Sequence, residues 1–442
     1  MKNLFTISFL IYSCSCLAQF QVGHRTITYL DPDRDNRTIE CEIYYPSDTH
    51  GENVDVSNDV FPVIVFGHGF AMQVVAYPNF WNEFFPRGYI MVFPTTEGSF
   101  ISPNHGEFAP HLQFLVSEMQ TQGSGFGSPF YQRVSGQSAL LGHSMGGGAA
   151  FLGASGFSNV SCVVGLAPAE TDPSAISAAS SITAPVLILS GSSDGVTPPE
   201  DHHIPIYDAA GSECKYFVSI ENGSHCHFAS NTVTCTLGEI IPGSLPAEAQ
   251  REVTYSVLHP WLDYFLYNDC GAWEDFQTSL SSQSDLGIIN AECTNDPPTI
   301  FDNNGTIESD PQINYQWYLN GNEISGADQQ TYTYSQSGTY QVGVTNIGNC
   351  PVLSNEVVVQ ITDIAAPRIE IVQVSNEQLV INTTHTTDPL RFEWIDLAGK
   401  LILSGACSFS AGNRATIQKP STRGLKLLRL SNSDMVKVWR LF

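Results

Sequence analysis

Short apolar runs alternate with amphipathic stretches along residues 20–290. The run 61–66 is apolar throughout and ends in Gly67-His68-Gly69, whereas 38–45 alternates polar and apolar residues. Strands that are apolar on both faces are typical of parallel sheets buried between helices, and alternation is typical of a half-buried strand. This region therefore predicts an α/β fold, a mostly parallel sheet flanked by helices. Further strands are predicted at 89–93, 139–141, 162–164, 185–189 and 215–220, and helices at 80–85, 112–119 and 252–267.

The pattern changes near residue 290. Residues 292–363 hold no Lys or Arg and predict short strands between turns, with the strand 315–319, the turn Asn320-Gly321 and the strand 338–344. The segment from 366 onward again predicts strands alone. A β-sandwich core does not merge with a doubly wound sheet, so we expect a domain boundary between 285 and 295. The predicted domains are an α/β domain at 19–290 and two small all-β domains at 291–365 and 366–442.

Each β region resembles a known domain. The strand that holds Trp317 and the strand Ser337-Gly-Thr-Tyr-Gln-Val342 resemble an immunoglobulin-like domain, with an unrelated β-sandwich as the alternative. The last region, with its Asp396-Leu-Ala-Gly-Lys400 turn and final basic strand, resembles the C-terminal sorting domain of the type IX secretion system. That resemblance implies secretion machinery as a partner; a small carbohydrate-binding sandwich is the alternative.

Residues 1–18 have the pattern of a signal peptide. Lys2 precedes the apolar run 4–10, and Cys16-Leu17-Ala18 forms a small-x-small cleavage site before Gln19. The run is too short to span a bilayer, and no later stretch reaches about 18 apolar residues. We therefore expect a secreted or cell-surface protein without a transmembrane segment. A buried N-terminal strand and a lipid anchor on Cys14 or Cys16 are the alternatives.

Export predicts that some cysteines pair, because disulfides persist in oxidising compartments. Of the 11 cysteines, Cys14 and Cys16 would leave with the signal peptide, and the odd number that remains leaves at least one thiol unpaired. Cys226 and Cys235 are the best local candidates for a pair. Cys293 and Cys350 could link a later domain.

The chain is strongly acidic, with 44 Asp and Glu against 18 Lys and Arg and a net charge of −26. Such a charge repels phosphate backbones and anionic lipid heads, which argues against nucleic-acid and membrane-surface partners. The charge is unevenly distributed. Residues 19–290 hold 29 acidic and seven basic residues, whereas residues 368–442 hold six acidic and ten basic residues. The acidic turn 31–37 lacks the Gly and the distal Glu of a calcium loop, so we predict a solvated hairpin and no metal site.

The motif Gly142-His143-Ser144-Met145-Gly146 carries the candidate chemistry. It follows the strand 139–141 and precedes an Ala- and Gly-rich helix start, the setting of a nucleophile elbow. A Ser in so sharp a turn needs small neighbours, and the helix start behind it favours developing negative charge. Ser144 is therefore the predicted catalytic nucleophile; a Gly-rich packing turn is the alternative.

A nucleophilic Ser needs a base and an orienting carboxylate, in the chain order Ser, acid, His. Asp194 and His225 each follow a predicted strand, so both lie at the carboxyl ends of the strands, where α/β folds bind ligands. The oxyanion hole needs two backbone N–H donors, which we assign to Phe70 and Met145. His68 precedes the Ser and is expected to orient its loop. The rivals to the acid and the base are Glu200, Asp201, His202, His203 and His227.

These motifs together resemble the cutinase-like polyester hydrolases, an α/β-hydrolase group that includes PET hydrolases. The resemblance covers about residues 20–280 and includes the Pro205-Ile-Tyr-Asp208 stretch. It implies Ser144, Asp194 and His225 as the triad and no cofactor. One departure is that Ala169 stands where the group has a Trp, so the aromatic clamp is incomplete. The resemblance further implies substrate contacts at Phe70, Gln73, His143, Ala169 and Val196.

The spacing between the predicted strands 162–164 and 185–189 indicates an open site. Only the 15 residues 170–184 precede the next strand, which accommodates a helix but no cap domain. An uncapped Ser nucleophile suits bulky or polymeric esters. The sequence therefore predicts a monomeric, secreted serine ester hydrolase of polyester-hydrolase type. The alternatives are a lipase or a general, chlorophyllase-like carboxylesterase, and more distantly a non-catalytic surface-binding protein.

Overall fold

The computed structural model describes residues 20–101, 103–230, 233, 235–293, 297–303, 305–312, 314–345, 347–348, 350–360, 369–373, 378–383, 390–408, 414–421, 426–431 and 436–441. The predicted signal peptide, with Cys14 and Cys16, lies outside these residues. The chain divides into two compact units, one made of residues 1–332 and 340–357 and the other of residues 333–339 and 358–442.

A mixed ten-stranded sheet forms the centre of the first unit, in the order β10-β9-β8-β7-β6-β4-β5-β2-β1-β3. The strands from β9 to β5 in this order pair in parallel. β10 pairs with β9, and β2 pairs with β5 and β1, in antiparallel fashion, while the short β3 joins β1 in parallel. The bounds are β1 Gln21–Asp31, β2 Arg37–Ser47, β3 Gly51–Glu52, β4 Phe61–Gly67, β5 Ile90–Pro94, β6 Val134–His143, β7 Cys162–Leu166, β8 Val186–Gly191, β9 Cys214–Ile220 and β10 Leu286–Cys293.

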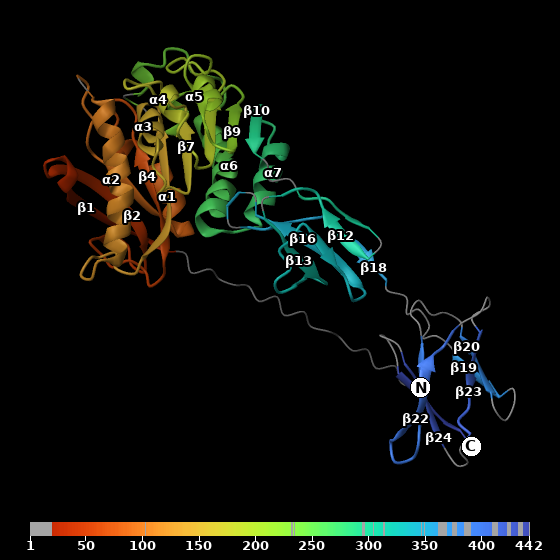
Figure 1. The fold of residues 1–442 in the computed structure, drawn as a ribbon. Coiled ribbons are helices and arrows are strands. Elements are labelled where there is room, and N and C mark those ends of the chain that lie inside the picture. The colour runs from red at the N-terminus through yellow and green to blue at the C-terminus, as the bar shows by residue number, and fades with distance from the viewer. Residues whose placement is uncertain are drawn as a thin grey trace, which may run out of the picture. The chain divides into compact units, whose positions relative to one another are not determined.

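Helices cover both faces of this sheet (Figure 1). Each face has its own layer of buried hydrophobic residues. The layer on one face contains the apolar residues of α2, α3, α4 and α5, and the other contains those of α1, α6 and α7. All seven residues of β4 are buried, as its apolar run predicts. The bounds are α1 Pro78–Phe84, α2 His105–Ser124, α3 Met145–Ala154, α4 Ala175–Ala179, α5 His203–Ala209, α6 Ala247–Tyr267 and α7 Ala272–Ser282.

The predicted mostly parallel sheet flanked by helices is present, and a hairpin lies at 31–37 as predicted, whereas the edge strand β10 was not predicted. β1 pairs with β2 over its full length, and the turn between them is the acidic segment 31–37. There Arg34 bonds the buried carboxylate of Asp31 at 2.6 Å. At the other edge, β10 carries the sheet to Cys293, three residues past the predicted end of the α/β domain.

Three disulfides cross-link the first unit. Cys226–Cys235 is confirmed. The predicted Cys293–Cys350 pair is wrong, because β10 pairs with β9 and brings Cys293 opposite Cys214, with which it is bonded. Cys350 is bonded instead to Cys270, between α6 and α7. Among the described residues, Cys41, Cys162 and Cys407 are free and buried. The prediction of at least one unpaired thiol is therefore confirmed.

The region after β10 contains two small sheets. One has the order β11-β12-β15 and the other β14-β13-β16-β17, with β18 also paired to β16. Trp317 is fully buried between them and donates its indole N–H to the carbonyl of Gln329 at 2.7 Å. The bounds are β11 Ile300–Asp302, β12 Thr306–Ser309, β13 Gln316–Leu319, β14 Asn322–Glu323, β15 Thr331–Thr333, β16 Gly338–Val344, β17 Val352–Leu353 and β18 Val357–Val359.

The second unit also contains two sheets, with the orders β19-β20-β23 and β22-β21-β24-β25. Its core includes Trp394, whose indole N–H donates to the carbonyl of Gln418. Asp396 closes the predicted turn by accepting the N–H groups of Ala398 and Lys400, each at 2.9 Å. The assignment of the two β regions as immunoglobulin-like and sorting domains stays a prediction. The bounds are β19 Ile369–Gln373, β20 Gln378–Thr383, β21 Arg391–Ile395, β22 Leu401–Ala406, β23 Arg414–Gln418, β24 Lys426–Ser431 and β25 Val436–Leu441.

Candidate active site

Ser144 occupies the sharp turn between β6 and α3. Its backbone has φ 57° and ψ −122°, a conformation that side-chain-bearing residues rarely adopt and that is typical of strained functional turns. A Cβ atom on Gly142 would overlap the carbonyl of Gly146, and one on Gly146 would overlap the carbonyl of Gly67. The glycines on both sides of Ser144 are therefore required for the turn to form.

Asp194 and His225 meet at the carboxyl ends of β8 and β9. The Nδ1 atom of His225 lies 2.6 Å from Oδ2 of Asp194, and both side chains are almost fully buried. Burial by itself raises the pKa of the Asp194 carboxyl group. The net pKa nevertheless lies below its ordinary value, because His225 donates a hydrogen bond and contributes its charge, and because His203 and the N–H of Thr197 lower it further. Asp194 is therefore a carboxylate that can orient His225.

The rival acids and bases lie elsewhere. Glu200 and Asp201 are exposed, and His202 uses Nδ1 to accept the N–H of Glu170 at 2.8 Å. His203 is fully buried, and its Nε2 lies 3.8 Å from Oδ2 of Asp194, the oxygen that His225 contacts at 2.6 Å. His227 is not among the residues that line a hollow with Ser144. Of the candidates, only Asp194 and His225 bring a carboxylate and an imidazole together beside Ser144.

Ser144 and His225 open into a hollow of about 280 Å³. Its wall is mainly apolar and includes Phe70, which is 49% exposed. Phe70 follows β4, and Met145 is the first residue of α3, so the two predicted oxyanion donors lie in the segments that flank Ser144. Their assignment as donors stays a prediction. The lining residues are Phe70, Ala71, Met72, Phe100, Ser144, Val196, His225, Cys235, Leu237 and Gly238.

The structure separates the predicted substrate contacts into four groups, of which the buried His143 is described below. Phe70 and Val196 line the hollow with Ser144. Gln73 lines a neighbouring hollow of about 420 Å³, together with His68 and Val75. Ala169 lies beneath the turn, where its N–H donates to the carbonyl of Ser144 at 2.9 Å.

His143 is fully buried and faces the protein interior. Its Nε2 lies 3.0 Å from the carbonyl oxygen of His225, and its Nδ1 lies 3.0 Å from the hydroxyl of Tyr77, which also accepts the N–H of Gly69. Burial and the charge of His225 lower the pKa of His143 to about 3, so this imidazole is neutral. His143 therefore connects the loop after β4 to the His225 loop.

The sequence interpretation missed the loop after His225. Leu237 and Gly238 line the hollow, and the buried carboxylate of Glu239 accepts the N–H groups of His225 at 2.7 Å and Cys226 at 3.1 Å. The disulfide Cys226–Cys235 closes this loop and was the one available signal that it folds back onto His225. Phe100 and Met72 also went unpredicted, because no motif surrounds them.

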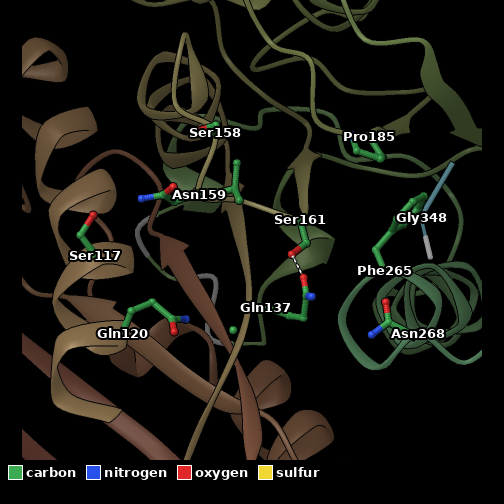
Figure 2. A pocket seen from close by; sticks show the side chains of 12 residues that line it. Ser117, Gln120, Gln137, Ser158, Asn159, Ser161, Pro185, Phe265, Asn268 and Gly348 are labelled. Carbon is green, nitrogen blue, oxygen red and sulfur yellow. Dashed lines mark hydrogen bonds between the residues drawn. The ribbon is translucent and has the colours of Figure 1, made fainter. Parts of the chain in front are cut away.

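A separate hollow of about 580 Å³ lies near the start of β7 and β8, whereas Ser144 follows the carboxyl end of β6. Figure 2 shows the residues that line this hollow. Hydroxyl and amide side chains line much of it, and Ser161 donates a hydrogen bond to Gln137 there. None of its described lining residues is titratable, so it offers no general acid or base. Within the described part of the chain, no His, Cys, Asp and Glu cluster could hold a metal ion, and no helix is long and apolar enough to cross a bilayer.

Comparison with known proteins finds a similarity at the level of a family. No curated protein matches the chain. Residues 38–241 match the PETase family, whose model is described as PET hydrolase-like, and the matched span contains Ser144, Asp194 and His225. This part of the chain is accordingly supported as an α/β-hydrolase of the PET hydrolase-like kind, a group of serine ester hydrolases.

Proposed function

We propose that this protein is a secreted serine hydrolase that cleaves bulky or polymeric carboxylic esters through an acyl-enzyme. The observation that carries the proposal is the buried 2.6 Å contact between His225 and Asp194, in a site where His225 shares a hollow with the strained Ser144. A carboxylate-bound imidazole beside a Ser in a strand-to-helix turn is the arrangement of acyl-transfer enzymes.

The reaction has two halves. His225 removes the proton of the Ser144 hydroxyl, whose oxygen attacks the ester carbonyl, while the N–H groups of Phe70 and Met145 stabilise the oxyanion. The tetrahedral intermediate collapses, and the leaving alcohol takes the proton from His225. Water then attacks the acyl-enzyme with His225 as base, which releases the carboxylic acid and restores Ser144.

Exposed apolar side chains around the hollow support a bulky substrate. Phe70, Phe100 and Leu237 line it and are 49%, 64% and 81% exposed. Ile101, Ile240 and Ile241 follow in the same loops and are also exposed. Exposed apolar clusters are typical of surfaces that bind an apolar partner. We call these six exposed side chains the apolar rim. On an acidic domain, such a rim is better matched to a neutral ester surface than to anionic fatty acids.

The short connection between β7 and β8, all of it described in the structure, also supports an extended substrate, because it adds no cap domain there. Between β7 and β8, residues 167–185 hold the five-residue helix α4 as their one helix. Export agrees with three disulfides in the described part of the chain. We further propose that the C-terminal unit serves type IX secretion.

A hydrolysis panel tests the function. The purified protein is assayed on a soluble p-nitrophenyl ester, a polyester film and an emulsified long-chain triglyceride, with Ser144→Ala as the matched control. We expect hydrolysis of the soluble ester and of the film, abolished in S144A without loss of folding. Activity on triglyceride alone would favour a lipase, and no activity on any ester would favour a binding protein.

A further inference from the structure

A second buried histidine lies next to the Asp194–His225 pair. His203, the first residue of α5, is fully buried, and each of its ring nitrogens has a partner. Nδ1 lies 2.7 Å from the hydroxyl of Ser190, and Nε2 lies 3.0 Å from the hydroxyl of Thr197. Ser190 is also fully buried, and Thr197 nearly so. The proposed reaction uses none of these three side chains.

Thr197 joins this histidine to the candidate triad. Its hydroxyl donates to Oδ2 of Asp194 at 3.1 Å and lies 2.9 Å from Nδ1 of His225. Its backbone N–H and that of Val196 each donate to Oδ1 of Asp194 at 2.8 Å. With His225 on Oδ2, both oxygens of the carboxylate have two donors, which fills the lone-pair positions of an ionised carboxylate.

The positions of the protons follow from the partners. Thr197 has a single hydroxyl proton, and a carboxylate is the strongest acceptor within its reach. Oγ1 of Thr197 can then only accept from His203, so Nε2 of His203 carries a proton. Burial lowers the pKa of His203 to about 3, so the ring is neutral and its Nδ1 accepts the Ser190 hydroxyl proton. Ser190 therefore donates to His203, His203 donates to Thr197, and Thr197 donates to Asp194.

We propose that Ser190, His203 and Thr197 form a positioning relay that holds Asp194, and through it His225, in the reactive orientation. Without the N–H of His203, the Thr197 hydroxyl is free to turn toward the carbonyl of Ala167, which lies 3.4 Å away. Asp194 then loses a donor and is free to rotate. The relay rests on the proposed esterase function, and it assigns a role to three residues that touch no substrate.

Paired conservative variants separate positioning from simple filling of space. In His203→Gln the amide nitrogen reaches toward Thr197, whereas the shorter His203→Asn reaches only toward Ser190. Thr197→Ser keeps the hydroxyl, and the isosteric Thr197→Val removes it. His111→Gln controls for loss of a buried histidine elsewhere, since His111 contacts Arg37 and Thr96. Thermal unfolding of each variant checks that it is folded.

Steady-state kinetics on a soluble ester give the first readout. We expect T197V and H203N to lower kcat about 10-fold, because a hydrogen bond to a charged group is lost, with KM unchanged. We expect T197S, H203Q and H111Q to keep kcat within about threefold of the wild type. Equal kcat values for H203N and H203Q, or an unchanged kcat in T197V, would overturn the relay.

A second readout does not depend on hydrolysis. The proton shared by His225 and Asp194 is expected to give a far-downfield NMR signal in the wild-type protein. T197V and H203N should broaden it through exchange with water, whereas T197S and H203Q should preserve it. If the wild type cleaves no ester, the proposed function fails while this signal still decides the relay. The same sharp signal in all four variants would contradict the relay.

Discussion

The Nε2 atom of His143 lies 3.0 Å from the carbonyl oxygen of His225. The neutral His143 ring donates this hydrogen bond and uses Nδ1 to accept from Tyr77, whose oxygen in turn accepts the N–H of Gly69. The proposed base is thus fixed twice, through its ring by Asp194 and through its backbone by His143. The residue before the proposed nucleophile thus holds the backbone of the proposed base.

This connection predicts the effect of removing the Tyr77 hydroxyl. Tyr77→Phe leaves the N–H of Gly69 without its acceptor and His143 without its donor. We expect kcat on a soluble ester to fall about 10-fold, since two buried hydrogen bonds next to the site are lost. Tyr89→Phe is the matched control, because the Tyr89 hydroxyl bonds Asp263 away from the site. An equal loss of kcat in both variants would contradict the role of Tyr77.

The loop closed by Cys226 and Cys235 should depend on its disulfide. Cys226→Ala with Cys235→Ala removes a short covalent loop, so we expect a loss of about 2–3 kcal/mol of unfolding free energy. Because Leu237 and Glu239 lie just beyond it, kcat/KM should fall as well. Urea unfolding and ester kinetics on the double variant measure both effects. Full activity in the double variant would show that Glu239 holds the loop without the disulfide.

The apolar rim should matter for films and not for soluble esters. Leu237→Ser removes an exposed wall residue, so we expect film hydrolysis to fall several-fold while kcat on a p-nitrophenyl ester changes little. Phe126→Ser is the matched control, since Phe126 is 94% exposed and lies in the loop before β6, whereas Ser144 follows the other end of that strand. Parallel losses on film and soluble ester would argue against a surface-binding rim.

Neutral buried histidines predict how stability depends on pH. His143 and His203 ionise near pH 6.5 when unfolded, but burial lowers the pKa of each to about 3 in the folded protein. The unfolded chain therefore binds more protons between these values, and stability is lost as the pH falls below 6.5. Each histidine contributes up to about 1.4 kcal/mol per pH unit. Urea unfolding between pH 7 and pH 4 should show a shallower slope in H203Q than in the wild type; an identical slope would contradict this account.

The residues whose positions depend on local geometry could be predicted from the sequence. A strand followed by Gly-His-Ser144-Met-Gly has few ways to fold, and Asp194 and His225 each follow an apolar strand. Tertiary contacts decided the rest. Cys293 was paired wrongly because its partner Cys214 is reached only through the antiparallel β9–β10 pairing, 79 residues apart along the chain.

Burial of polar side chains was the hardest feature to predict. His143 was assigned to the substrate, and His203 was weighed only as a rival base, yet both are fully buried and hydrogen-bonded. Their partners Tyr77 and Ser190 lie in other elements, 66 and 13 residues away, and no motif signals the contact. Leu237 and Phe100 likewise join the hollow through loop folding, which hydrophobic periodicity does not encode.

Covalent labelling tests the central claim most directly. The wild-type protein is treated with a fluorophosphonate, and the modified residue is located by peptide mass spectrometry. Attack by an activated Ser144 predicts a single adduct on Ser144, formed rapidly in the wild type, much more slowly in His225→Ala and not in S144A. No adduct on Ser144 in the folded wild-type protein, or labelling that is equally fast in His225→Ala, would contradict a Ser144–His225–Asp194 esterase.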